Sequence, residues 1–513
     1  MNFLRSAFVV SSGTLLSRIF GFIRDIFFAK YLGTGFLSDV FLTAFRLPNF
    51  FRNIFAEGAF QRAFVPLFAG TIEKKNDEET HTFANNILSI LLYFLLILTI
   101  VIEIFMPTVI KIIAPGFINN PSKFALAITL SKITFPYLIF ISLVSFLSGI
   151  LNSLNKFAAV SLAPIILNIC LILGSIASSI AHINVAITLS YAVLVGGILQ
   201  LFWLMFFTLK EGIILFPRIP VWRTKTKEFA RNFFTSFIGS GVTQLNSMID
   251  SIMATTIAGA VSYIYYGDRI SQLPLALIGT ALSTTILPVL SKKIVSEDAN
   301  EINKIQELSI FISLFIGIPA GVGLFMLSDL IIPMLFERGA FVHGDSVAVA
   351  SVLKVYAISL PITILIKILQ TIYYAHKDTK TPMYISIFSL ISNVILNFIL
   401  MKFMSFMGII LSTVITSFAN LFFLFIILYK RNKLIISKDL LNKIAKILYS
   451  SIIMGITILA CNLCLKDSGT LLSRIEKFTA TSILAVLVYF FISYVVGAIN
   501  SKFINEILVK DNQ

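Results

Sequence analysis

The sequence predicts an all-α polytopic membrane protein with about fourteen transmembrane helices, and three observations support this fold class. Of the 513 residues, 57% are hydrophobic, and the mean hydropathy is +0.93. Charged residues make up only 13%, against roughly 25% in soluble domains. Apolar segments of about 20 residues, long enough to cross a bilayer, recur along the chain with short loops between them. A soluble core could not bury this much apolar surface, so the chain belongs to the membrane class.

Each predicted span is a long apolar stretch, and the second is polar in its middle, so we expect it to be bent or broken. The first span is interpreted as a retained helix and not as a signal peptide, because it contains Arg18 and Arg24 and lacks a small-residue cleavage site. The predicted spans are 6–30, 36–68, 83–108, 125–150, 158–181, 184–208, 229–258, 267–291, 306–334, 347–375, 381–402, 407–429, 441–464 and 477–499.

The net charge of +15 is distributed unevenly over the loops, and rich and poor loops alternate. This alternation is the positive-inside pattern of a multi-pass protein in the bacterial inner (cytoplasmic) membrane, and it predicts that both termini are cytoplasmic. One miscounted span would invert every later loop, so the alternation also checks the helix count. The basic residues of the predicted cytoplasmic loops are Lys74, Lys75, Lys156, Lys210, Arg218, Arg223, Lys225, Lys227, Arg231, Lys292, Lys293, Lys304, Lys377, Lys380, Lys430, Arg431, Lys433, Lys438 and Lys443.

An internal repeat divides the chain. Several residues of the first half recur in the second half at offsets between 222 and 226 residues, which is a shared offset over a long stretch. The repeat unit therefore holds about six helices, and an even number gives both halves the same orientation, with a pseudo-twofold axis along the membrane normal. The matched pairs are Asp25 and Asp250, Leu47 and Leu273, Pro48 and Pro274, Ala59 and Ala281, Pro66 and Pro288, Pro136 and Pro361, and Asn168 and Asn393.

Four parts follow from the repeat and the loops. They are an N-lobe over 1–208, a cytoplasmic linker over 209–228, a C-lobe over 229–430, and two additional helices with a cytoplasmic tail over 431–513. Two lobes related in this way enclose a central cleft, which is where transporters place their substrate. The linker has room for an amphipathic interfacial segment but not for an enzyme domain.

The first predicted span carries an arginine that a lipid-facing helix would not tolerate. Arg18 lies about 13 residues from the inner end, or roughly 20 Å at 1.5 Å per residue, which is near the middle of the membrane. Snorkelling rescues only arginines close to a helix end, so Arg18 must face a partner or water. Arg24 follows beside Asp25, and a structural pairing of these two is an alternative, although adjacent helical residues do not face each other.

The second predicted span adds further charge. Arg52 is again near the middle, and an internal pair of Arg52 with Glu57 is the structural alternative to ligand binding. Arg46 and Arg62 are equally open to a structural role, and Arg269 of the eighth span could bind the aspartate beside it. Several arginines on a cleft wall suit phosphate, because each guanidinium offers a fork of donors to phosphate oxygens and stays charged at any depth. A cationic drug would be repelled by such a wall.

Other function classes are not supported. The basic residues lie in loops between apolar spans, so we expect no nucleic-acid partner. The chain has no Walker motif, no nucleophile with a base and no paired catalytic carboxylates, so we expect a transporter without ATP hydrolysis and no enzyme. Cys461 and Cys464 have redox spacing but lie in an apolar span without a second pair, so we interpret them as structural and expect no metal-binding histidine or cysteine cluster.

The second lobe has a different polar set, formed by Asp250, Asn393, Asn397 and Thr413. Asn393 and Asn397 are four residues apart and therefore share one helix face. A carboxylate with amide and hydroxyl oxygens would suit a monovalent cation such as sodium, while hydrogen bonding between helices is the structural alternative.

A set of short motifs along the chain carries a family resemblance, and Ala56-Glu57-Gly58-Ala59-Phe60 is the most specific of them. The other segments are Ser17-Arg18, Gly21-Phe22-Ile23-Arg24-Asp25, Leu32-Gly33, Ser38-Asp39-Val40-Phe41, Arg46-Leu47-Pro48-Asn49, Arg52, Ala63-Phe64-Val65-Pro66, Tyr265-Tyr266-Gly267-Asp268-Arg269, Tyr373-Tyr374-Ala375, Asp378 and Lys380-Thr381-Pro382. With these motifs the sequence resembles the MurJ (MviN) family of lipid II flippases over essentially the whole chain.

The resemblance implies the fold of the multidrug/oligosaccharidyl-lipid/polysaccharide exporters, with the last two helices forming a groove for a polyprenyl tail. It implies a flippase that moves lipid II, an undecaprenyl-diphosphate disaccharide-pentapeptide, to the periplasmic leaflet for cell-wall synthesis. The implied substrate-binding residues are Arg18, Arg24, Asp39, Arg52, Glu57 and Arg269, and the implied sodium ligands are Asp250, Asn393, Asn397 and Thr413.

These observations predict alternating access without a cofactor, driven by sodium or by the membrane potential. One departure from the family pattern is Asn397, which stands where a carboxylate is expected. The alternative function is a flippase for another polyprenyl-diphosphate-linked oligosaccharide, of the O-antigen or capsule type. The expected partners are lipid II and membrane lipids, together with proteins of cell-wall synthesis.

Overall fold

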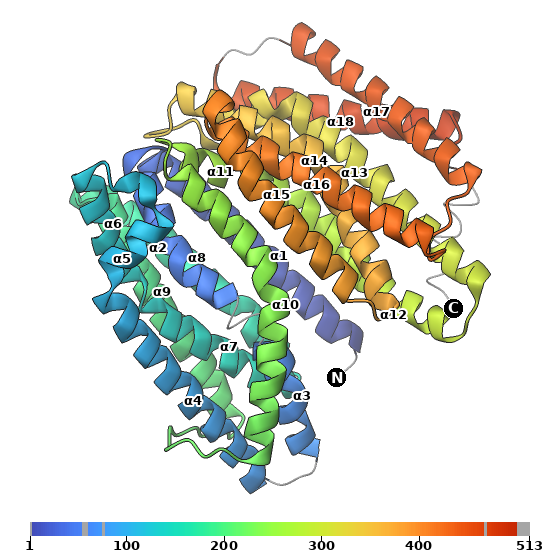
Figure 1. The fold of residues 1–513 in the computed structure, drawn as a ribbon. Helices are drawn as coiled ribbons and strands as arrows, with labels where there is room; N and C mark the ends of the chain where they lie inside the picture. The colour runs from blue at the N-terminus through green and yellow to red at the C-terminus, as the bar shows by residue number, and fades with distance from the viewer. Residues whose placement is uncertain (1–2, 54–59, 74–76, 466–468, 500–513) are drawn as a thin grey trace. The chain divides into compact units, whose positions relative to one another are not determined.

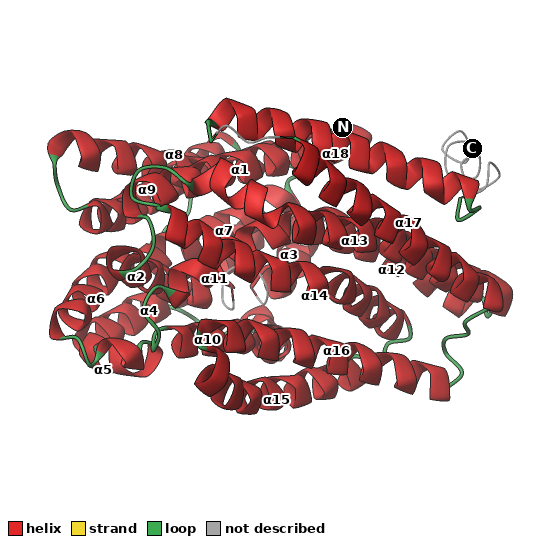
Figure 2. Cartoon of the chain, turned by 90° about the horizontal axis from the view of Figure 1, so that it is seen from above, coloured by secondary structure: helices red, strands yellow, loops and turns green. Residues whose placement is uncertain are grey.

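The computed structural model describes residues 3–53, 60–73, 77–465 and 469–499, and these residues form helices and loops without a strand (Figures 1 and 2). The helices of the N-terminal half are α1 (Phe3–Leu32), α2 (Phe36–Arg52), α3 (Phe60–Glu73), α4 (Asp77–Ile104), α5 (Met106–Ile113), α6 (Pro121–Thr134), α7 (Tyr137–Ser153), α8 (Phe157–Ala181), α9 (Val185–Lys210) and α10 (Thr224–Ala254). Those that follow are α11 (Ala260–Pro274), α12 (Ala281–Val295), α13 (Ala299–Phe336), α14 (His343–Ala375), α15 (Lys380–Met404), α16 (Phe406–Lys430), α17 (Lys438–Cys464) and α18 (Leu471–Val495).

The all-helical membrane fold is confirmed. In the described part of the chain, 11 helical segments are long and apolar enough to cross a membrane. The other predicted spans coincide with α1, with α2 and α3, and with α10, so a count of fourteen is compatible with the structure. The predicted break of the second span falls between α2 and α3, where residues 54–59 lie outside the described part. Prolines divide other spans, as Pro136 does between α6 and α7.

Two compact units make up the chain. The first contains residues 1–262 and 338–341, and the second contains 263–337 and 342–513. Helix α10, which the repeat assigns to the C-lobe, belongs to the first unit and packs there against α3. The predicted lobes were defined by the sequence repeat, whereas the two units are defined by contacts in space. The compact units therefore do not test the lobe boundaries, which stay a prediction.

Small residues bring helices of the first unit close together. Helices α8 and α9 pack along each other, and a methyl group added to Gly196 would lie 2.7 Å from the side chain of Leu167. Gln200 of α9 donates to the carbonyl of Ala163 at 2.9 Å, and Trp203 donates to the carbonyl of Ala159 at 3.0 Å. In lipid the hydrophobic effect does not drive helices together. Close packing of their backbones and hydrogen bonds between them stabilise the helix pairs instead.

The linker between α9 and α10 is anchored to α4. Side-chain atoms of α4 bond to its backbone: Asn85 Oδ1 accepts from the Phe216 amide at 2.9 Å, and Ser89 Oγ accepts from the Arg218 amide at 2.7 Å. Asn86 accepts from the Val221 amide at 2.7 Å and donates to the carbonyl of the same residue. We call residues 213–223 the strap. Helix α10 begins at Thr224, earlier than the predicted start at 229, because Asn86 also bonds to Thr226 and so fixes the first turn.

The second unit pairs α13 with α14, α15 with α16, and α17 with α18. Asp378 caps the first turn of α15 through the Thr381 amide at 3.0 Å and also binds Arg431 at 2.8 Å. Burial would raise the pKa of this carboxyl, but the bonds from Thr381 and the charge of Arg431 outweigh burial and lower it. Tyr489 of α18 donates to the Phe315 carbonyl of α13 at 2.6 Å, so the last two helices are fastened to the rest of the unit.

Candidate functional site: charged side chains of the first and second units

The α1 arginines have contrasting environments. Arg18 is exposed, and within the described part of the chain no hydrogen bond or ion pair is found for it. Arg24 is buried and binds Asp25 at 2.7 Å. Its other terminal nitrogen donates to Asn168 of α8 at 2.9 Å, and Asn168 in turn donates to the Ser17 carbonyl at 3.3 Å. Neighbouring residues on a helix can pair here because the long arginine side chain bends back to the carboxylate.

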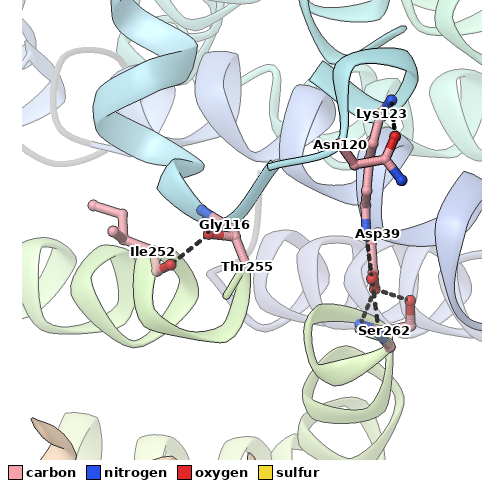
Figure 3. Close-up of polar contacts among 8 residues, drawn as sticks. Asp39, Gly116, Asn120, Lys123, Ile252, Thr255 and Ser262 are labelled. Carbon is pink, nitrogen blue, oxygen red and sulfur yellow. Dashed lines mark hydrogen bonds and ion pairs between the residues drawn. The ribbon is translucent and has the colours of Figure 1, made fainter. Parts of the chain in front are cut away.

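Asp39 of α2 is fully buried, and its carboxylate accepts four hydrogen bonds from three residues (Figure 3). One carboxylate oxygen accepts from the Ser262 amide at 3.1 Å and from its hydroxyl at 2.6 Å. The other accepts from Lys123 Nζ at 3.0 Å and from the Gly259 amide at 2.9 Å. In this structure the carboxylate is therefore saturated with hydrogen bonds from the protein, and it fastens the connection between α10 and α11 to α2.

Local sequence places Lys123 at this cluster. Asn120 accepts from the Lys123 amide at 3.1 Å and caps α6, whose first residue is Pro121. This cap puts Lys123 in the first turn, where its ammonium also lies 4.5 Å from the centre of the Phe117 ring. No role was assigned to Lys123 from the sequence. The Asn-Pro cap signal was present, but nothing in the sequence paired this lysine with Asp39.

The C-terminal end of α2 holds further predicted residues. Arg52 is half-buried in the last turn, and it donates to Asn53 at 3.4 Å. Asn53 donates to Gln244 of α10 at 3.3 Å. A small pocket lies beside α2, and Arg46 is the charged residue of its lining. The pocket is lined by Thr43, Arg46, Leu47, Phe50, Ile113, Met248, Ser251 and Ile252. Glu57, the remaining predicted residue of this region, lies outside the described residues.

In the second unit, Arg269 is half-buried on α11 and lies over the Tyr265 ring, with its guanidinium carbon 5.0 Å from the ring centre. It also donates to the Tyr265 hydroxyl at 3.4 Å. Gly267 beside it allows close packing, because a methyl group there would lie 2.5 Å from the side chain of Val352.

Three of the four predicted sodium ligands meet in the second unit. Asn393 donates to Thr413 at 3.2 Å, and Asn397 donates to Asn393 at 3.0 Å. Ser412, which sequence reasoning missed, donates to Asn397. These bonds join α15 to α16, which is the predicted structural alternative. Asp250 belongs to the first unit.

The predicted residues thus form separate clusters. In the first unit, Arg24 is bound to Asp25 and Asn168, whereas Asp39 is bound to Lys123 and the α10–α11 connection. Among the described residues, no group of three or more His, Cys, Asp or Glu side chains could hold a metal ion, and the three cysteines are free thiols. Many apolar helices with buried charges inside them define a polytopic membrane transporter.

Comparison with known proteins narrows this class. The family model for the lipid II flippase MurJ matches residues 28–500. Proteins of Rhizobium tropici and Rickettsia prowazekii, each named a probable lipid II flippase MurJ, are both 37% identical to the chain; each match covers 98% of it, with 95% and 99% of those proteins. The chain therefore belongs to the MurJ family of lipid II flippases. The family is one of transporters, which confirms the predicted transporter class and the resemblance.

Solved structures agree with the fold. A lipid II flippase MurJ in an inward closed conformation matches with a TM-score of 0.80 and 29% identity, covering 95% of this chain and 98% of that chain. An inward-facing multidrug resistance MATE family transporter matches with a TM-score of 0.65 at 15% identity, covering 83% of this chain and 98% of that chain, which indicates a shared fold alone.

Proposed function

We propose that this protein flips lipid II, the undecaprenyl-diphosphate-linked disaccharide-pentapeptide, from the cytoplasmic to the periplasmic leaflet. The observation that carries the proposal is the family match over residues 28–500, together with relatives that are 37% identical over 98% of the chain. The relatives are named for lipid II and not for an O-antigen or capsule precursor, so the alternative substrate is not supported.

The exposed Arg18 and the half-buried Arg52 are the first-unit residues that we assign to the diphosphate, because both guanidinium groups belong to apolar predicted spans and both side chains retain some exposure. Arg24 is held by Asp25 and Asn168, so we assign it to positioning of α1 against α8 unless that cluster opens during transport. A diphosphate accepts donors from several guanidinium forks at once, which gives arginine its advantage over lysine at these positions.

Transport by alternating access needs a driving force. A cation-lined site could be reset by the membrane potential, since each charge moved through 100 mV is worth about 2.3 kcal/mol. Sodium binding by Asn393, Asn397 and Thr413 together with Asp250 is the second candidate source.

The direct test uses Arg18→Ala and Arg18→Lys in a strain depleted of the native protein, with Lys304→Ala on the exposed face of α13 as the matched control. We expect the Ala variant to abolish growth and the appearance of lipid II in the outer leaflet, and the Lys variant to retain only part of it. Full growth and normal lipid II translocation with both variants would remove Arg18 from the site. Normal translocation in depleted cells without any copy would overturn the function itself.

A further inference from the structure

The strap exposes large apolar side chains that the rest of the first unit does not cover. Its five most exposed apolar residues have relative exposures between 53% and 84%. Water is an unfavourable surrounding for so much apolar surface on one short segment, and such a patch marks an interaction surface. The five residues are Ile214, Phe216, Ile219, Val221 and Trp222.

Hydrogen bonds to α4 hold the strap in this arrangement (Figure 1). Three backbone amides of the strap donate to the side chains of Asn85, Asn86 and Ser89. Paired amides can lie against a medium of low polarity, whereas unpaired amides would be costly there. The bonds therefore satisfy backbone groups of the strap while its large apolar side chains stay exposed.

The level of these bonds along α4 is informative. The first turn of α4 contains the acidic residues Glu78 and Glu79, and the apolar part of the helix begins at Phe83. Asn85 and Ser89 follow Phe83 by two and six residues, or about 3 Å and 9 Å along the helix. The strap thus lies beside the start of an apolar span, where polar head groups meet the hydrocarbon of a membrane.

Positive charge accompanies the apolar side chains. Arg218 and Arg223 are exposed, and among the described residues neither side chain has an ion pair or a hydrogen bond. The strap contains no acidic residue, and Glu211, which precedes it, binds Lys156 at 2.8 Å. Exposed apolar side chains beside uncompensated cations are typical of segments that lie on membranes containing anionic lipids.

We propose that the strap binds anionic phospholipids of the leaflet that the charge pattern predicts to be cytoplasmic. The apolar side chains insert at the boundary between head groups and hydrocarbon, and Arg218 and Arg223 bind head-group phosphates. Trp222 suits this boundary, because its ring is apolar while its indole N–H is polar. A zwitterionic lipid offers the same apolar contact without a net negative charge, so the two arginines give the strap its preference. A soluble protein partner would need the apolar side chains to face water, which the level along α4 does not favour.

The test uses Trp222 as the reporter, because the only other tryptophan of the chain is Trp203. Full-length protein with Trp203→Phe is placed in phosphatidylcholine nanodiscs that contain a minor fraction of acyl-brominated phosphatidylglycerol or the same fraction of acyl-brominated phosphatidylcholine. Bromine quenches tryptophan fluorescence only at close range. We expect both lipids to quench Trp222, with phosphatidylglycerol enriched roughly fivefold at the strap, as one arginine near an anionic surface would produce. The difference between the wild type and Trp222→Phe gives the same signal without a change at Trp203.

The double variant Arg218→Gln with Arg223→Gln should lose the preference for phosphatidylglycerol and keep the quenching by both lipids. The matched control is Lys292→Gln with Lys304→Gln, two exposed lysines of the second unit, and it should keep the preference. Equal quenching of the parent protein by the two brominated lipids would overturn the proposal, as would an unchanged preference in the double arginine variant. No quenching by either lipid would place the strap in water and favour a protein partner. None of these results depends on transport of lipid II, so the proposed function can stand where this proposal fails.

Discussion

At the scale of single residues, the buried Asp39–Lys123 pair shows how expensive charges are kept in this protein. Both side chains are nearly inaccessible, with relative exposures of 1% for Asp39 and 10% for Lys123. Such a pair stabilises a fold only if its remaining hydrogen-bonding capacity is satisfied, and here Gly259 and Ser262 satisfy the carboxylate. The pair therefore holds the α10–α11 connection against α2 and α6.

Removing one partner should be worse than removing both. We expect Asp39→Asn to lower the free energy of unfolding by about 3–5 kcal/mol, because the Lys123 ammonium stays buried without its counter-charge. The double variant Asp39→Asn with Lys123→Met should recover part of that loss. The measurement is the melting temperature of the four proteins in the same detergent. Additive effects of the two substitutions would show that the pair does not act as a unit.

Only some of the charged residues within or near the spans could be recognised from the sequence as candidates for a role. The unusual depth of Arg18 and Arg52 could be inferred from hydropathy, because a charge stands out in an apolar span. Lys123 was missed because it lies near the end of a predicted span, where lysines are ordinary, and its partner Asp39 is far away in the sequence.

At the scale of elements, the helices could be predicted and the strap could not. Every predicted span coincides with described helices, because about 20 apolar residues can satisfy their backbone in a bilayer only as a helix. The strap has no such constraint. The strap is held in place by hydrogen bonds from its backbone amides to asparagine and serine side chains of α4. Bonds between side chains and a distant backbone leave no periodic pattern in the sequence, so they could not be predicted.

The strap supplies a test at this scale. In Asn86→Ala the segment loses its bonds at Val221 and Thr226, and each hydrogen bond is worth about 0.5–1.5 kcal/mol. We expect trypsin to cleave after Arg218 or Arg223 roughly tenfold faster than in the wild type, because the strap leaves α4 more often. Asn119→Ala, at an exposed asparagine, is the matched control. Equal cleavage rates in all three proteins would show that Asn86 does not hold the strap.

At the scale of the whole molecule, the repeat predicted from the sequence and the compact units of the structure divide the chain differently. The repeat pairs Asp25 with Asp250 and so begins the second half near α10, whereas compactness leaves α10 in the first unit, where it packs on α3 and is reached by Asn53. A repeat reflects the descent of the sequence, while compactness reflects which surfaces are in contact in one state. The two divisions therefore describe different properties of the chain, and α10 is the helix that they assign differently.

Orientation in the membrane is the whole-molecule property that the positive-inside rule predicts most sharply. We expect cysteines placed at His182 and His343 to react with a membrane-impermeant maleimide added from the periplasmic side, and cysteines placed at Lys210 and Lys430 to be protected. The background is a chain with Cys170, Cys461 and Cys464 replaced by serine. Because one extra or missing span inverts all later loops, the outcomes are distinct. Labelling at Lys210 and not at His182 would show either that the N-terminus lies outside or that a span before His182 is miscounted. The expected result at these two sites, combined with labelling at Lys430 and not at His343, would locate a miscounted span between α9 and α14.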